Sequence, residues 1–354
     1  MVNHTKKPKD SIKLTSFSHG AGCGCKIAPS VLETILGVSK ENNGDTDPNL
    51  LVGNLTKDDA AVYDLGNGQA IISTTDFFTP IVDDPFIFGK IAAVNAISDV
   101  YAMGGKPLLA IAILGWPIDK ISPEIAGTVL DGAKFACKEA GIQLAGGHSI
   151  DALEPIFGLA VTGQVPIKHL KKNSTAKAGS TLYLTKALGV GIITTAEKKG
   201  IVSDEDMQFA VDSMSGLNNI GELFGELNYV NAMTDVTGFG LLGHLVEMCE
   251  GCDISAEIEK SKIPVLPNIQ PYLDQNAIPG GTKRNWNSYG HKIDGIEKSD
   301  WAVLADPQTS GGLLVSVDGG HEAEFEELCA GQGYNLHPIG ITTERQEAVV
   351  KMKT

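Results

Sequence analysis

The segment 84–105 places the tightest limit on the fold, because it predicts a helix that is apolar on nearly every side. Asp84 is a favourable N-cap, Pro85 fits the first turn, and Gly104-Gly105 ends the helix. The residues from Ile91 to Val100 are apolar around almost the whole circumference. We therefore expect this helix to be buried, with other elements covering it.

Two polar residues, Asn95 and Asp99, interrupt this apolar helix. Their i, i+4 spacing places them on the same face. A buried carboxylate is costly unless it is paired or bound to a metal ion. We therefore interpret Asp99 as a metal ligand and not as a solvated residue.

Other aspartates stand where predicted strands begin or end. Lys57-Asp58-Asp59 precedes an apolar run, Ala70 to Asp76 reads as a strand closed by an acid, and Asp235 closes a strand in the second half. Strand ends are common positions for sites on α/β scaffolds. Each aspartate alone is explained as a turn former or cap. Together they predict a metal cluster.

The stretch His19 to Lys26 carries two thiols, Cys23 and Cys25, and an amine among three glycines. Glycine has a large ordering entropy, so we expect this segment to be mobile until a ligand binds. The cation of Lys26 favours the reactive thiolate. A zinc knuckle lacks a second Cys/His pair, and reducing compartments disfavour a disulfide. The remaining alternative is a disordered leader with incidental cysteines.

Length and charge define the class of protein. A chain of 354 residues predicts two domains, and its formal charge of −15 argues against a nucleic-acid partner. An acidic protein can still bind a nucleotide through bridging metal ions. The opening residues 1–7 do not resemble a secretory signal, and the apolar run 108–114 is too short to span a membrane. We expect a cytoplasmic protein without a membrane partner.

The remainder of the first half predicts a second helix from Ser122 to about Ala140, with Cys137 in its core-facing side. A strand over 143–145 leads into a glycine-rich turn, Gly146-Gly147-His148-Ser149, whose amides can face a phosphate or ribose. A strand over 157–165 follows, and the polar stretch 168–179 is typical of a linker.

The second half predicts a similar alternation of strands and helices. The expected strands are 181–185 and a strand ending at Asp235, and the expected helices are 189–199, 204–227, 241–248 and 322–331. The turn 306–313 leads into an apolar strand. Cys249 and Cys252 close a helix instead of opening one, so we interpret them as structural.

Five motifs together resemble the selenophosphate synthetase family, also called selenide, water dikinases. They are His19-Gly20-Ala21-Gly22-Cys23-Gly24-Cys25-Lys26, Lys57-Asp58-Asp59-Ala60-Ala61, Gly146-Gly147-His148-Ser149, Thr234-Asp235-Val236-Thr237-Gly238-Phe239-Gly240 and Asp306-Pro307-Gln308-Thr309-Ser310-Gly311-Gly312. The resemblance extends from about residue 12 to the end. The thiol segment is its discriminating part, because the wider aminoimidazole-ribonucleotide-synthetase-like ATP-binding superfamily lacks it.

The resemblance implies an α+β fold of two domains, with a flexible glycine-rich N-terminal segment and lead-in over 1–53. An ATP-binding and dimerisation domain would occupy 54–167, its sheet pairing with that of a second subunit into a β-barrel. A C-terminal α/β sandwich domain, with helices on one sheet face, would occupy 168–354.

The resemblance also implies an activity. ATP, selenide and water would give selenophosphate, AMP and orthophosphate, with Mg²⁺ as cofactor, supplying selenium for selenocysteine and selenouridine synthesis. The implied partners are a second subunit and a selenium-delivery protein. Two alternatives stay open: another superfamily member that phosphorylates an organic substrate, and a thiol-based selenium or metal carrier without ATP hydrolysis.

By the same resemblance each candidate site residue takes a role. Cys23 and Lys26 would be catalytic. The metal ligands would be Asp59, Asp99 and Asp235. The nucleotide would be bound by Lys26, Thr56, Lys57, Asp58, Asp76, Asp99, Gly147, His148 and Ser149, the last three from the partner subunit.

Overall fold

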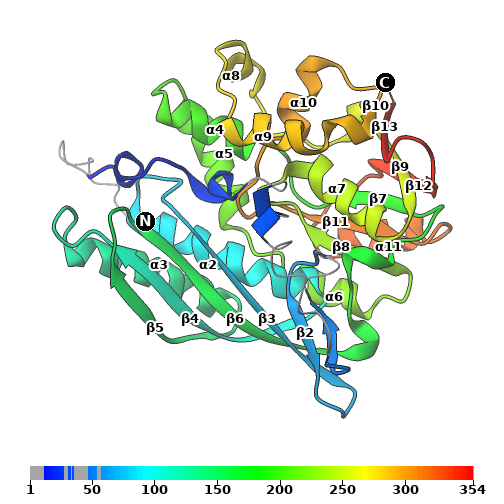
Figure 1. The fold of residues 1–354 in the computed structure, drawn as a ribbon, viewed down its shortest axis with the longest axis horizontal. Helices are drawn as coiled ribbons and strands as arrows, with labels where there is room; N and C mark the ends of the chain where they lie inside the picture. Colours follow the sequence, from blue (N-terminus) through cyan, green and yellow to red (C-terminus); the bar gives the residue numbers. More distant parts are fainter. Residues whose placement is uncertain (1–11, 28–30, 33, 36–46, 54–56, 354) are drawn as a thin grey trace.

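The computed structural model describes residues 12–27, 31–32, 34–35, 47–53 and 57–353, which form two mixed sheets with helices packed on them (Figure 1). Within these residues the first sheet has six strands in the order β1-β2-β3-β6-β4-β5. Its strands are β1 (Leu50–Val52), β2 (Ala61–Asp64), β3 (Gln69–Phe78), β4 (Lys106–Trp116), β5 (Gln143–Asp151) and β6 (Ile156–Pro166). All neighbours pair antiparallel except β4 and β5.

Helices α2 (Pro85–Ala102) and α3 (Pro123–Glu139) cover one face of this sheet (Figure 1). The prediction for α2 is confirmed: the Asp84 side chain accepts a hydrogen bond from the Ile87 amide at 3.0 Å, and residues 91–102 are all buried. Glycines let the two helices approach closely, because a Cβ on Gly89 would lie 1.8 Å from the Val129 carbonyl oxygen. The buried α2 thus lies between the sheet and α3.

The second predicted helix is also present as α3, with Cys137 in the core. Ser122 stands at its N-cap, but its side chain makes no capping hydrogen bond. Gly141 follows the helix with φ of +72°, a conformation that costs glycine little.

The expected turn at Gly146-Gly147-His148-Ser149 is wrong, because these residues continue strand β5. Their backbone pairs with β4 in parallel, and the pairing shifts at a bulge between Ala110 and Ala112. The glycines serve this pairing: Gly146 has φ of +138°, and a Cβ on Gly147 would lie 2.3 Å from the Ala112 carbonyl oxygen. The glycine pair that predicts a turn is part of a bulged edge strand.

The stretch 168–179, predicted as a linker, connects the two sheets and is partly buried. It contains two short 3-10 helices, η4 (Ile167–His169) and η5 (Asn173–Thr175). The buried ammonium of Lys171 donates to the carbonyl oxygens of Leu227 and Val230 at 2.8 and 2.7 Å. These bonds fix the connection between the two halves of the chain.

In the described chain the second sheet has seven strands in the order β10-β13-β9-β12-β7-β11-β8. They are β7 (Thr181–Leu184), β8 (Val230–Asp235), β9 (Ile254–Glu259), β10 (Ile293–Asp294), β11 (Leu313–Val317), β12 (Gly340–Glu344) and β13 (Val350–Lys353). Adjacent residues of β7, Leu182 and Tyr183, point into different core clusters. Helices therefore cover both faces of this sheet, with α7 on one and α6 and α11 on the other, and the expectation of a single covered face is wrong.

The helices of the second half are α4 (Val190–Lys198), α5 (Asp204–Ser215), α6 (Ile220–Glu226), α7 (Gly240–Gly251), α8 (Gln270–Asp274), α9 (Gly280–Tyr289), α10 (Lys298–Leu304) and α11 (Glu322–Gly331). The single helix expected over 204–227 is wrong, because Gly216 takes an extended conformation and separates α5 from α6. Cys249 is fully buried and burial raises its pKa to about 12, which supports its structural interpretation.

The N-terminal residues enter between the two halves as two 3-10 helices, η1 (Leu14–Phe17) and η2 (Gly22–Cys25). In Figure 1 this segment, in blue, crosses from the first sheet's helices towards α4 and α9. Residues 1–11 lie outside the described residues. Over the described ranges, no helix has the length and apolar character needed to cross a membrane.

Candidate active site

A cleft of about 520 Å³ lies where the two halves of the chain meet. Its walls combine β3 and α2 of the first half with the loop after β8 and the middle of α7 in the second half. Lys26 reaches it from the N-terminal segment. Other lining residues are Lys57, Asp58, Asp59, Thr74, Thr75, Asp76, Asp99, Asp235, Thr237, Phe239, His244 and Glu247.

The Cys23 thiol lies buried beside this cleft, with the residue 1% exposed. Its Sγ donates to the Asn95 Oδ1 at 3.3 Å, and its backbone amide donates to the Thr309 Oγ1 at 3.0 Å. Asn95, the first polar exception of α2, also donates from Nδ2 to the Asp76 Oδ2 at 2.6 Å. Its Oδ1 accepts the Ser310 amide at 2.7 Å. Asn95 therefore links Cys23 to both halves of the chain.

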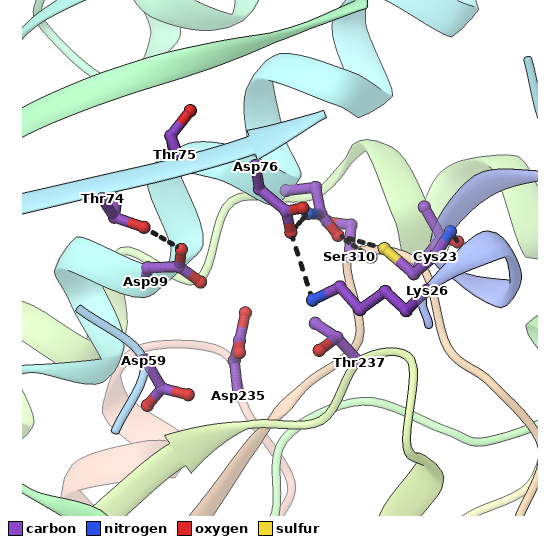
Figure 2. Close-up of polar contacts among 12 residues, drawn as sticks. Cys23, Lys26, Asp59, Thr74, Thr75, Asp76, Asp99, Asp235, Thr237 and Ser310 are labelled. Carbon is purple, nitrogen blue, oxygen red and sulfur yellow. Dashed lines mark hydrogen bonds and ion pairs between the residues drawn. The ribbon is translucent and has the colours of Figure 1, made fainter. Parts of the chain in front are cut away.

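Lys26 extends from the same segment towards Asp76, with Nζ 3.6 Å from the Asp76 Oδ2 (Figure 2). Its side chain is 39% exposed, so it is accessible from the cleft. Burial lowers the pKa of Lys26, but the nearby carboxylates, Asp76 first among them, outweigh that effect and raise it. The ammonium is therefore a fixed positive charge at the cleft.

The expected thiolate at Cys23 is wrong for this arrangement. Burial raises the pKa of the thiol, and the charge of Asp76 raises it further. Lys26 and the hydrogen bond with Thr309 lower it, but by less. In this buried position the thiol of Cys23 is therefore protonated near neutral pH, which fits its role as a hydrogen-bond donor to Asn95.

The aspartates Asp59, Asp99 and Asp235 point towards a common region below Lys26 (Figure 2). Thr234 donates to the Asp59 Oδ1 at 2.8 Å, and the Thr74 hydroxyl donates to the Asp99 Oδ2. Burial and mutual repulsion raise the pKa of Asp59 and of Asp99, and burial raises that of Asp235 to about 6. The charges of these carboxylates thus lack sufficient compensation from the surrounding side chains.

The donor set suits a hard cation. The buried Oδ2 atoms of Asp59 and Asp235 have no hydrogen-bond partner, and oxygens of this kind are the ligands that Mg²⁺ prefers. As placed, no three His, Cys, Asp or Glu side chains of the described residues form a group that could hold one metal ion. The aspartates predicted as metal ligands are therefore brought to one region without forming a complete ligand shell.

Three predicted nucleotide residues precede β2. Lys57 and Asp58 line the cleft, and both also contact the stretch 168–179 that connects the two sheets. Asn173 of that stretch donates from its backbone amide to the Asp58 Oδ1 at 2.7 Å and from Nδ2 to the Lys57 carbonyl at 2.9 Å. Lys57 has φ of +53°, an uncommon conformation for a residue with a side chain. Thr56 lies outside the described residues.

Gly147, His148 and Ser149 do not join this cleft. They line a separate hollow of about 310 Å³ between β4, β5 and α3. Strand β5 is the edge of the first sheet, and β6 and β4 separate it from β3. Within one chain these residues are therefore remote from Asp76.

Several residues beside the site are not marked as functional by the sequence alone. The helical spacing places Asn95 on the same face as Asp99 but does not indicate its contact with Cys23. Thr309 and Ser310 belong to the motif 306–312, but their contacts join segments more than 200 residues apart, which local patterns do not reveal. His244 faces the cleft as a neutral acceptor for the Thr237 amide at 3.1 Å, because burial lowers its pKa to about 3.

Comparison with known proteins agrees with this architecture. Residues 57–165 match the family described as AIR synthase related protein, N-terminal domain, and residues 177–353 match the corresponding C-terminal domain. The chain is 61% identical over 330 residues to a protein of Aeromonas hydrophila subsp. hydrophila named selenide, water dikinase. The match covers 93% of this chain and 95% of that protein.

Solved structures share the fold at low sequence identity. The structure of tt0281 from Thermus thermophilus matches with a TM-score of 0.69 and 18% identity, covering 92% of this chain and 98% of that one. Hydrogenase maturation protein HypE in complex with ATP matches with a TM-score of 0.61 and 18% identity, covering 97% and 94%. At this identity the likeness establishes the two-domain α+β fold alone.

Proposed function

Because the chain belongs to the selenide, water dikinase family, we propose that it converts ATP, selenide and water into selenophosphate, AMP and orthophosphate. One observation carries the proposal beyond family membership. A thiol and an amine of one glycine-rich segment, Cys23 and Lys26, lie beside a cleft with three carboxylates, of which Asp99 and Asp235 are buried and Asp59 is partly buried. Phosphoryl transfer requires mainly positioning and charge neutralisation, and this arrangement offers both.

ATP would occupy the cleft, with Lys26 against its phosphates as a point charge. Asp59, Asp99 and Asp235 would hold Mg²⁺ together with those phosphates. The bound ion would neutralise charge on the phosphate oxygens. The phosphates would then supply the ligands that the three carboxylates lack by themselves.

Cys23 would handle selenium or assist its attack on the phosphate. The thiol must leave its buried place to meet selenide, because it is only 1% exposed. Leaving the buried place would remove the desolvation that raises the pKa of Cys23. Return of the segment would then exclude water from the cleft. The flexibility of the segment is part of this proposal.

The test is phosphorus NMR under anaerobic conditions with the full chain, ATP, Mg²⁺ and selenide. We expect a phosphate signal coupled to selenium together with AMP. The matched control is Cys23→Ser, which keeps a hydrogen-bond donor towards Asn95 and should lower selenide-dependent AMP formation by about 100-fold or more. No selenium-coupled signal from the wild-type chain would refute the proposal, and wild-type rates in the variant would remove Cys23 from catalysis.

We further propose that the active form is a homodimer joined through the first sheet. The face of this sheet opposite α2 carries apolar side chains that solvent reaches: Phe77 is 50%, Ile111 45% and Ile150 61% exposed. Tyr63 and Leu109 extend the same surface. Exposed apolar patches of this kind mark interaction sites, and a second copy of the same face is the simplest partner.

Sedimentation equilibrium tests the dimer. We expect the wild-type chain to have about twice the monomer mass of 37.3 kDa, and Ile111→Asp to have the monomer mass. The control is Ile341→Asp on β12, an isoleucine with a similar exposure of 43% in the other sheet, which should leave the dimer intact. A monomeric wild-type chain would contradict the proposal. A cytoplasmic location and a selenium-delivery protein stay predictions from the sequence.

A further inference from the structure

The backbone of the thiol segment is held from outside by two exposed cations of the second half. Arg284 of α9 donates from Nη2 to the Gly24 carbonyl oxygen at 2.8 Å. Lys198 at the end of α4 donates from Nζ to the Gly20 carbonyl oxygen at 2.6 Å. The two bonded carbonyls lie on either side of Cys23 along the chain. In Figure 1 the segment lies beside the two helices that carry these cations.

Around Gly22 and Cys23 the segment packs into a buried site, called the seat below, formed by Thr79, Ile81 and Thr309. The Gly22 amide donates to the Thr79 carbonyl at 3.0 Å, and the Cys23 amide bonds to Thr309. The seat leaves no room for a side chain at Gly22, where a Cβ would lie 2.4 Å from a side-chain carbon of Ile81. The glycines of the segment have no side chain to anchor, so at Gly20 and Gly24 the segment is held through its backbone carbonyls. The side chains of His19, Cys23 and Lys26 make further polar contacts.

We infer that Arg284 and Lys198 act as a latch that sets how often Cys23 is exposed to solvent. Both are positioning residues in this inference, since each contacts the segment and neither lines the cleft. The inference depends on the proposed function only for its consequence, which is that latch strength limits access of selenide to the thiol. The geometry of the latch itself is independent of the reaction.

The position of Arg284 supports this role. Its helix is fixed by its neighbours: Asn285 donates to the Gly238 and Ala305 carbonyls at 2.9 and 3.1 Å, and the Tyr289 hydroxyl donates to the Phe239 carbonyl at 2.6 Å. Gly281 of the same helix approaches Gly24, because a Cβ there would lie 3.5 Å from the Gly24 oxygen. A rigid helix thus presents a flexible cation to the backbone of the segment next to Cys23.

The experiment measures alkylation of Cys23 by iodoacetamide in the full chain, in a Cys25→Ser background so that one thiol of the segment reacts. Mass spectrometry follows Cys23 and, as an internal reference, Cys137, which is 1% exposed in α3 and reacts only when the fold opens. Loss of one such hydrogen bond should raise the Cys23 rate by about three- to tenfold in Arg284→Ala and in Lys198→Ala. The double variant should show about the product of the two effects.

Matched variants separate the latch from general loosening. Lys283→Ala changes the exposed neighbour of Arg284, and Lys199→Ala changes a cation that donates to the Gln275 and Asn276 carbonyls instead. Both should leave the Cys23 rate unchanged, and Arg284→Lys should restore part of the protection. Unchanged Cys23 rates in both alanine variants, or a parallel rise at Cys137, would overturn the latch. If the latch variants behave as expected but the wild-type chain forms no selenophosphate, the proposed function fails and the latch stands.

Discussion

Asp306 follows α10 and is a buried carboxylate that accepts hydrogen bonds from the first amides of α4. Its protonation couples folding to pH. Its Oδ2 accepts hydrogen bonds from the Gly191 amide at 2.9 Å and from the Gln308 Nε2 at 2.8 Å, while its buried Oδ1 has no partner. Burial raises the pKa of Asp306 from 3.8 to about 8, although these hydrogen bonds lower it in part. The folded protein therefore binds a proton here that the unfolded chain has released at neutral pH.

This difference in the pKa of Asp306 between the folded and unfolded states predicts the direction in which stability changes with pH. Between pH 4 and 8 the folded state holds more protons at Asp306, so its contribution to the free energy of unfolding falls by up to about 1.4 kcal/mol for each pH unit of increase. Asparagine at position 306 cannot titrate, so Asp306→Asn should remove this loss of stability with rising pH. Relative to wild type, the variant should therefore become progressively more stable from about pH 5.5 to about pH 7.5 in chemical denaturation.

The control is Asp131→Asn, an exposed residue of α3 paired with Lys134 at 3.0 Å. Its stability difference from wild type should stay nearly constant over the same pH range. A constant difference for Asp306→Asn as well would show that the carboxyl is ionised in the folded state.

At the residue scale the sequence indicated which acids line the cleft, but not the protonation state of the thiol beside it. Asp59, Asp76, Asp99 and Asp235 could be selected because acids beside strand ends or inside an apolar helix are visible in the sequence. The protonated state of Cys23 could not be predicted, because burial raises the pKa of the thiol by more than the charge of Lys26 lowers it. Burial depends on residues far away in the chain.

At the scale of single elements, prediction succeeded where local signals were complete. α2 carries a cap, a proline, an apolar run and a glycine stop, and its bounds were found from them. The predicted turn at 146–149 was wrong because the Gly146-Gly147 pair is a turn signal locally, whereas the pairing of β5 with β4 requires close backbone approach there. The break between α5 and α6 was missed because an apolar pattern continues through it.

At the scale of the whole molecule, the site combines distant parts of the chain. Asp59 and Asp99 belong to the first half and Asp235 to the second. Lys171 links the two halves, because its backbone amide donates to the Met103 carbonyl and its ammonium donates to the Leu227 and Val230 carbonyls. The remaining mismatch is the position of Gly147, His148 and Ser149 in a hollow at the sheet edge. If these residues bind nucleotide, the cleft that they serve belongs to another subunit.

Mixing two inactive variants tests this arrangement. Asp235→Asn removes a carboxylate of the cleft and should lower activity by about 100-fold or more, because even changes to the groups that orient metal ligands typically cost about 10- to 100-fold. The double variant His148→Ala with Ser149→Ala removes side chains at the sheet edge without adding a Cβ at Gly147. In a mixed dimer of the two, one cleft would carry both defects and the other neither, so the mixed dimer should have about half of wild-type activity. Random pairing in a 1:1 mixture makes about half of the dimers mixed, so the activity of the whole sample should recover to about a quarter of wild type.

Subunit exchange controls this experiment. The two variants are mixed in denaturant and refolded together, and each is also refolded alone to measure its residual AMP formation from ATP and selenide. Refolding each variant with Ile111→Asp, which should not pair, must give no recovery. Equal activity in mixed and separate samples would place His148 and Ser149 outside the partner's cleft. Recovery only after mixing would require a nucleotide site shared between subunits, because neither chain alone then contains an intact one.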